Sequence, residues 1–99
     1  TRYRSSAASD VYKRQVEGGI EAQTHQVMKN LIEVLNAAGS SLEKVIFARV
    51  YLVNFGDFDR MNHIYASYFA KDKLPARTCI GVTGLAVGAS VEIDFIAAC

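Results

Sequence analysis

The sequence contains few of the residues that cross-link or interrupt a small protein. Among 99 residues there are two cysteines, one proline and no tryptophan. Cys79 and Cys99 are too few for a disulfide framework and too far apart for a Cys-x-x-Cys site. This cysteine usage favours a reducing compartment, and we expect a cytoplasmic protein.

Long apolar runs and an excess of one charge are also absent. No apolar stretch approaches the roughly 18 residues of a membrane-spanning helix, and no secretory signal is recognisable. Residues 1–15 carry four basic residues and one acidic residue, whereas the other 84 carry seven basic and nine acidic residues. A domain with this balance has no basic stripe to neutralise phosphates, which argues against nucleic acid as a partner.

Cofactor signatures are missing as well. No G-x-x-x-x-G-K-[ST], G-x-G-x-x-G or G-x-S-x-G string occurs. His25 and His63 stand on predicted helices without a second ligand three or four residues away. We therefore expect no metal and no nucleotide cofactor.

The residues that are present suit one globular domain, since 51% are hydrophobic and 21% are charged. Residues 1–15 show no periodicity and are predicted to be a disordered or non-native tail, which leaves 16–99 as the domain. A chain this short buries only about 60–65% of its unfolded surface, so association with identical copies would help to stabilise it.

Two helices are predicted. Apolar residues recur at helical spacing from 20 to 38, and Gly39 stands where a left-handed residue would end that helix. An aromatic stripe predicts the second helix from 58 to 70 and is assigned to packing against a sheet.

Three strands are predicted, at 45–53, 76–83 and 90–98, where β-branched and aromatic residues alternate. In the first strand, aliphatic side chains should face the helices, and large amphipathic ones should face a neighbouring subunit or, alternatively, solvent. The aliphatic set is Ile46, Ala48, Val50 and Leu52, and the amphipathic set is Phe47, Arg49 and Tyr51. The order of elements predicts an α+β fold with helices on one face of a small mixed sheet.

Four residues of the last two strands could carry chemistry. Alternation places Arg77 with Cys79, and Glu92 with Asp94. If these strands pair, an arginine that binds a planar carboxylate lies near a glutamate that can activate water. From spacing alone, a structural cross-strand ion pair is the favoured interpretation over catalysis. Cys79 could be a nucleophile, although a buried cysteine usually fills space.

Two segments closely resemble the signatures of the RidA/YjgF family of reactive-intermediate deaminases. They are Leu-Pro-Ala-Arg-Thr-Cys at 74–79 and Val-Glu-Ile-Asp-Phe-Ile-Ala at 91–97. Segments 16–24, 38–43 and 65–69 are also similar to this family, so the likeness spans 16–99. Residues 5–15 instead resemble the translation of a sequencing adapter.

The resemblance implies a chorismate-mutase-like two-layer fold and a homotrimer with a pocket at each subunit interface. It also implies hydrolysis of enamines and imines, such as 2-aminoacrylate, to 2-oxo acids and ammonia without a cofactor. Arg77 would bind the substrate carboxylate and Glu92 would activate the water. Cys79 and Asn62 would line the pocket, with Asn62 reaching it from the adjoining subunit.

The chain departs from the family pattern at three places. The N-terminal hairpin with its pocket tyrosine and Ser-Gly-Gln segment is missing, so we expect an incomplete copy with an unprotected sheet edge, and an organelle-targeting segment could have been lost with it. Asp94 replaces the usual Glu, and residues 84–89 lack the frequent Leu-Pro pair.

Two other functions remain open. One is a non-enzymatic trimeric ligand-binding or chaperone-like module, and the other is a ribonuclease or translation inhibitor. Retention of Arg77 and Glu92 favours the enzyme. The slightly acidic domain, without a catalytic histidine constellation, counts against the ribonuclease.

Overall fold

A computed structural model describes residues 1–6 and 19–98. Its main elements follow the order β1 (Arg2–Ser6), α1 (Ile20–Ala37), β2 (Val45–Leu52), α2 (Phe58–Ser67), β3 (Ala76–Gly81) and β4 (Val91–Ala97). Short 3-10 turns precede β2, α2 and β4. Within the described ranges, no helix is long and apolar enough to cross a membrane.

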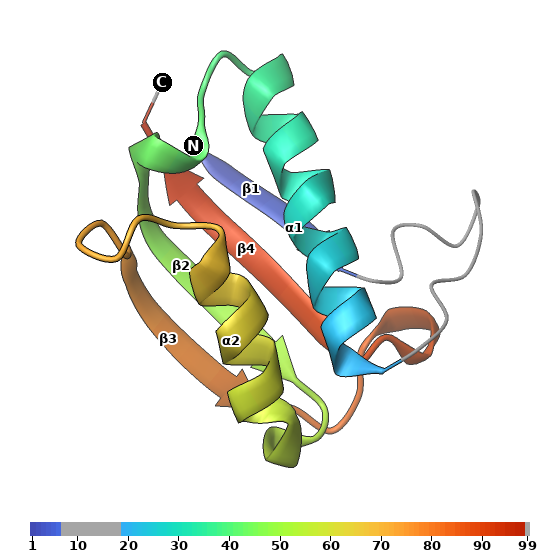
Figure 1. Cartoon of the computed structure of the whole chain (residues 1–99). Helices are drawn as coiled ribbons and strands as arrows, with labels where there is room; N and C mark the ends of the chain where they lie inside the picture. Colours follow the sequence, from blue (N-terminus) through green and yellow to red (C-terminus); the bar gives the residue numbers. More distant parts are fainter. Residues whose placement is uncertain (7–18, 99) are drawn as a thin grey trace.

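The four strands form one sheet in the order β1-β4-β2-β3. β4 is antiparallel to both of its neighbours, whereas β2 and β3 are parallel. Both helices cover the same face of this sheet (Figure 1), with α1 in front of β1 and β4 and α2 in front of β2 and β3. The predicted two-layer α+β fold is confirmed. We call the face away from the helices the open face.

The core fills the space between the helices and the sheet. Alternation along β4 turns one set of side chains inward, as predicted, and α1 contributes an apolar stripe whose polar member, Thr24, donates its hydroxyl to the carbonyl of Ile20 at 2.7 Å. The largest fully buried side chains include Tyr65, Phe95, Met28, Leu31, Leu35, Leu52, Met61 and Ile93.

The helix ends agree with the sequence at some positions and differ at others. Gly39 follows α1 with a φ of 79°, the left-handed conformation predicted for it. The second helix was predicted to reach residue 70 but ends at Ser67. Beyond it, the amide groups of Tyr68 and Phe69 bond to carbonyls three residues back, which is tighter than α-helical geometry.

A β-bulge overturns one assignment in the first strand. Val45 pairs with Ala97, but the next pair joins Phe47 to Ile96, so Ile46 is the extra residue. Its side chain is 61% exposed, and Val45 is buried in its place. The prediction that Ile46 faces the helices is therefore wrong, because strict alternation does not survive a bulge.

The N-terminal segment also differs from expectation. The prediction that residues 1–15 lack regular structure is wrong for Arg2–Ser6, which form β1 along the edge of β4. Tyr3 packs against the core, and β1 covers this edge of β4, so the expected unprotected sheet edge does not lie there. Residues 7–15 lie outside the described residues, and whether the segment is non-native stays a prediction.

One position carries backbone strain. Val87, in the connection before β4, has a φ of 55° and is 66% exposed. A β-branched side chain is disfavoured in this left-handed conformation, whereas asparagine tolerates it.

We expect Val87→Asn to raise the free energy of unfolding by about 1 kcal/mol, because strain is relieved and little packing is lost. Urea unfolding at 25 °C measures the change. Val34→Asn is the matched control, since Val34 is also exposed but lies in α1, where the exchange is nearly neutral. Equal effects of the two substitutions would show that the φ of Val87 costs nothing.

Candidate functional site

A pocket of about 280 Å³ opens between α2 and the segment that leads into β3. Its walls combine an arginine, an asparagine and a tyrosine with small and apolar side chains. The lining residues are Asn62, Tyr65, Ala66, Leu74, Pro75 and Arg77. A pocket with a few convergent polar groups in a mostly apolar wall is typical of a small-molecule site.

Among the described residues, Arg77 is the only cation in this wall. Its neighbour across the parallel ladder is the buried Ala48, so its side chain points to the helix layer. The guanidinium Nη1 donates a hydrogen bond of 2.6 Å to Oδ1 of Asn62. Its central carbon also lies 4.9 Å from the ring centre of Tyr65 and 5.5 Å from that of Phe58.

All of these partners of Arg77 are neutral. Among residues 1–6 and 19–98, no carboxylate lies within ion-pair distance of its guanidinium. Such a group is held in place yet keeps donors for a planar, two-oxygen anion. The arrangement can therefore bind a carboxylate, and Asn62 orients the arginine that would do so.

Cys79 lies two residues further along β3 on the same face and packs against the core. Burial raises the pKa of its thiol, and the charge of Arg77 opposes this shift only in part. A thiol with a raised pKa is protonated at neutral pH and is a poor nucleophile. The geometry thus favours Cys79 as a space-filling residue beside the pocket, whose wall it does not join.

Glu92 lies elsewhere. β3 pairs with β2 rather than with β4, and Glu92 aligns with Tyr51 on the open face. Arg77 belongs instead to the helix-facing row of Ala48 and Phe95. The prediction that Arg77 and Glu92 share one surface is therefore wrong within a single chain, because β2 separates their strands and their side chains point to opposite faces.

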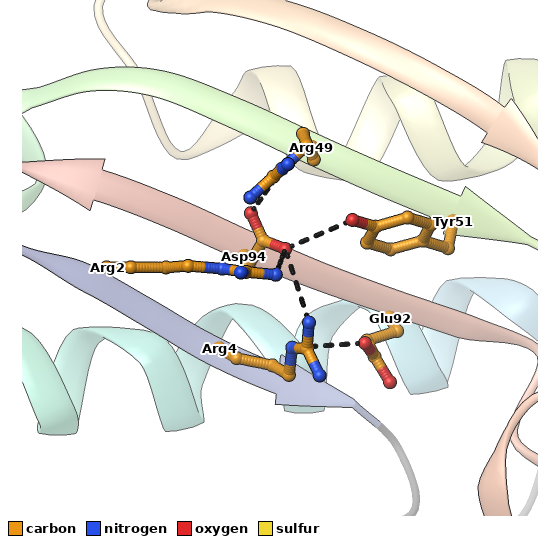
Figure 2. Close-up of polar contacts among 6 residues, drawn as sticks. All are labelled: Arg2, Arg4, Arg49, Tyr51, Glu92 and Asp94. Carbon is orange, nitrogen blue, oxygen red and sulfur yellow. Dashed lines mark hydrogen bonds and ion pairs between the residues drawn. The ribbon is translucent and has the colours of Figure 1, made fainter.

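A charged network surrounds Glu92 and Asp94 on the open face (Figure 2). The side chain of Asp94 is only 1% exposed. Its carboxylate accepts hydrogen bonds from Nη2 of Arg2 at 2.9 Å, Nε of Arg49 at 3.1 Å and the hydroxyl of Tyr51 at 3.2 Å. The hydrogen bond to Asp94 and its negative charge raise the pKa of Arg49.

Arg4 links the two carboxylates. Its Nε lies 3.3 Å from Oε2 of Glu92, and its Nη2 lies 3.9 Å from Oδ2 of Asp94. Sequence reasoning missed Arg2 and Arg4, because it placed both in a tail. The sequence does carry a signal for them, because Arg2 and Arg4 are two residues apart, as Glu92 and Asp94 are. This signal becomes useful only when the pairing of β1 with β4 is known.

Metal ligands do not gather in the part of the chain that the structure describes. No group of three or more His, Cys, Asp or Glu residues there could hold a metal ion. His63 is exposed, and Nδ1 of His25 in α1 lies 2.7 Å from the hydroxyl of Tyr68, the residue that follows α2.

Tyr65 combines burial with an unpaired hydroxyl. Its side chain is 2% exposed, and its hydroxyl has no hydrogen-bond partner among the described residues. Burial raises the pKa of Tyr65 to about 12, against the smaller opposing effect of Arg77. The folded protein therefore favours the neutral phenol, whereas an unfolded tyrosine ionises near pH 10.

This stabilisation is present below pH 10 and is lost as the pH rises toward 12. We expect Tyr65 to lower the free energy of unfolding across that interval by on the order of 2 to 3 kcal/mol. Tyr65→Phe should lack this part of the alkaline loss of stability. At pH 7 its free energy of unfolding should match or exceed that of the original protein, because the unpaired hydroxyl contributes nothing there. Urea unfolding at pH 7, 10, 11 and 12 measures both, and parallel alkaline losses in the two proteins would contradict the assignment.

Comparison with known proteins gives consistent matches. The family model described as Endoribonuclease L-PSP matches residues 6–99. A RutC family protein of Pyrococcus horikoshii is 45% identical over 82 residues, which are 83% of this chain and 64% of that protein. A mouse protein named 2-iminobutanoate/2-iminopropanoate deaminase is 42% identical over 82 residues, which are 83% of this chain and 60% of the mouse protein.

A solved structure shows the same fold. The crystal structure of a Rid family protein from Yersinia pestis superimposes with a TM-score of 0.84 at 38% identity, and the match covers 90% of this chain and 71% of that one. The chain spans about 64% of the length of the first relatives it matches. The resemblance carried by segments 74–79 and 91–97 is confirmed, and the chain belongs to the Endoribonuclease L-PSP family, which includes the RidA, YjgF and RutC proteins.

Proposed function

We propose that this chain is a subunit of a 2-iminoacid/2-enamine deaminase, which hydrolyses small reactive imino acids such as 2-aminoacrylate to 2-oxo acids and ammonia. The observation that carries the proposal is the guanidinium of Arg77, which lies in a pocket of about 280 Å³ with only neutral partners. The mouse deaminase, 42% identical, adds support.

In the proposed reaction, Arg77 binds the substrate carboxylate and the pocket holds the short side chain. An enamine first tautomerises to the imine, whose carbon is already electrophilic. Water adds to this carbon while Glu92 takes one of its protons and the imine nitrogen gains one from solvent, which gives a carbinolamine. Glu92 then returns its proton to the nitrogen, which leaves as ammonia while the hydroxyl releases a proton to solvent. The carbon–nitrogen double bond is replaced by a carbon–oxygen double bond. No redox change occurs, so orientation and proton transfer suffice.

We further propose that the active unit is a homotrimer with sites at subunit interfaces. Arg77 and Glu92 point to opposite faces of one sheet, so a site that uses both takes them from different copies. The open face is suited to such contact, because it carries half-buried Phe47 and Tyr51 beside an exposed Ile80.

The first test follows pyruvate release from 2-aminoacrylate, which a serine dehydratase generates in the same cuvette. We expect the chain to accelerate release and Arg77→Ala to lower kcat/KM by about 100-fold, because a charged hydrogen-bonded contact to substrate is lost. Arg77→Lys should retain charge but lose the planar fork, with an intermediate effect.

The matched control is Lys29→Ala, which also removes a cation but lies exposed on α1, away from the pocket and from the open face. Its kcat/KM should stay within about twofold of the original value, since surface substitutions rarely matter. Equal activity of Arg77→Ala and Lys29→Ala would refute the role of Arg77.

A mixing experiment tests the shared site. Arg77→Ala and Glu92→Gln chains should each be inactive, yet refolding them together should restore part of the activity, because some interfaces then receive an intact residue from each chain. Each variant refolded alone is the control. If mixtures stay as inactive as the single variants, Arg77 and Glu92 do not meet across subunits.

The second candidate is a non-enzymatic ligand-binding module. The observation in its favour is that a single chain brings Arg77 together with Asn62 but not with Glu92. The pocket of one chain therefore has a group that binds an anion but no general base. Such a module would bind a stable 2-oxo acid such as pyruvate through Arg77 and leave the hydrolysis rate unchanged. Calorimetric titration with pyruvate, alongside the coupled assay, separates the two functions.

A further inference from the structure

The open face holds its two carboxylates in different ways. Asp94 has a side chain that is 1% exposed and has partners on both oxygens. The side chain of Glu92 is 16% exposed, and among the described residues its ion pair involves only Oε2. Asp94 is therefore a structural anion, whereas Glu92 keeps an oxygen that can face a reactant.

A single guanidinium, that of Arg4, orients Glu92. Its Nε lies 3.3 Å from Oε2 of Glu92, and its Nη2 reaches toward Oδ2 of Asp94 at 3.9 Å. Figure 2 shows Arg4 between the two acidic side chains, which project from the same strand two residues apart. Two anchor points fix the plane of the guanidinium, which in turn fixes the oxygen that it contacts.

Arg2 provides a natural comparison. It comes from the same strand, and its Nη2 binds Asp94 at 2.9 Å; among the described residues, no ion pair joins Arg2 to Glu92. The side chains of Arg2 and Arg4 are 46% and 55% exposed, so they differ little in surroundings. They differ in which carboxylate they hold.

We propose that Arg4 is a positioning residue for the reaction, and this rests on the proposed function of Glu92. By occupying Oε2, Arg4 holds the carboxylate in one orientation and directs Oε1 to the attacking water. Arg4 does not touch the substrate, because the carboxylate of the substrate is bound by Arg77 on another element. Its effect therefore falls on the chemical step rather than on binding.

The kinetic test compares Arg4→Gln, Arg4→Lys and the control Arg2→Gln in the coupled assay. Arg4→Gln should lower kcat by about three- to tenfold while KM stays within about twofold, because only orientation of the base is lost. Arg4→Lys should recover part of kcat, since it restores the cation. Arg2→Gln should leave kcat within about twofold. A kcat for Arg4→Gln equal to that of Arg2→Gln would overturn the proposal.

A second measurement is independent of activity. Side-chain carbon relaxation in protein labelled at glutamate reports the order of Glu92, whose signal is assigned by its loss in Glu92→Gln. Arg4→Gln should lower the order parameter of the Glu92 side chain, and Arg2→Gln should not. Unchanged order in Arg4→Gln overturns the proposal even in an inactive chain. If Arg4→Gln lowers the order of the Glu92 side chain but the original chain shows no activity in the coupled assay, the deaminase function is overturned instead.

Discussion

The buried carboxylate of Asp94 is the interaction on which the arrangement of the sheet depends. An ionised carboxylate removed from water costs several kcal/mol unless it is paired and hydrogen-bonded. The partners come from the strands on both sides, Arg2 from β1 and Arg49 with Tyr51 from β2. These partners are oriented correctly only when β1 and β2 both flank β4 in the observed register, so the same contacts that pair the charge also favour that strand order.

The alternation of strands then separates the functional groups. Side chains that neutralise Asp94 occupy the open face, and Glu92, two residues away on the same strand, must share that face. The side chain of Arg77 points to the other face of the sheet, where it contacts Asn62, Tyr65 and Phe58 of α2. A one-residue change of register in β4 would move its buried row, Val91, Ile93, Phe95 and Ala97, out of the core and into water. The separation of Arg77 from Glu92 is therefore a consequence of the core, and a site that uses both residues requires a second copy.

The local parts of this fold could be predicted from the sequence. The start of α1, the left-handed Gly39, and the inward row of β4 follow from periodicity and from residue conformational preferences. What failed depended on distant partners or on local geometry that leaves no trace in a pattern. Ile46 leaves the core because of a bulge, and β1 forms only because β4 offers a complementary edge. The pairing of β3 with β2 likewise decided where Arg77 lies, and spacing alone could not distinguish this from pairing with β4.

The two halves of the proposed site also differ in how they depend on the chain. The Arg77 pocket is assembled from α2 and the start of β3, which are close in sequence, so its geometry is set by a local helix–strand unit. The orientation of Glu92 instead depends on β1, which lies almost the full length of the chain away. Loss or replacement of the N-terminal strand would leave carboxylate binding in place and remove the control of the base. A family member altered in this region would thus retain its ligand while its chemistry weakened, which is a direct structural route from an enzyme to a binding module.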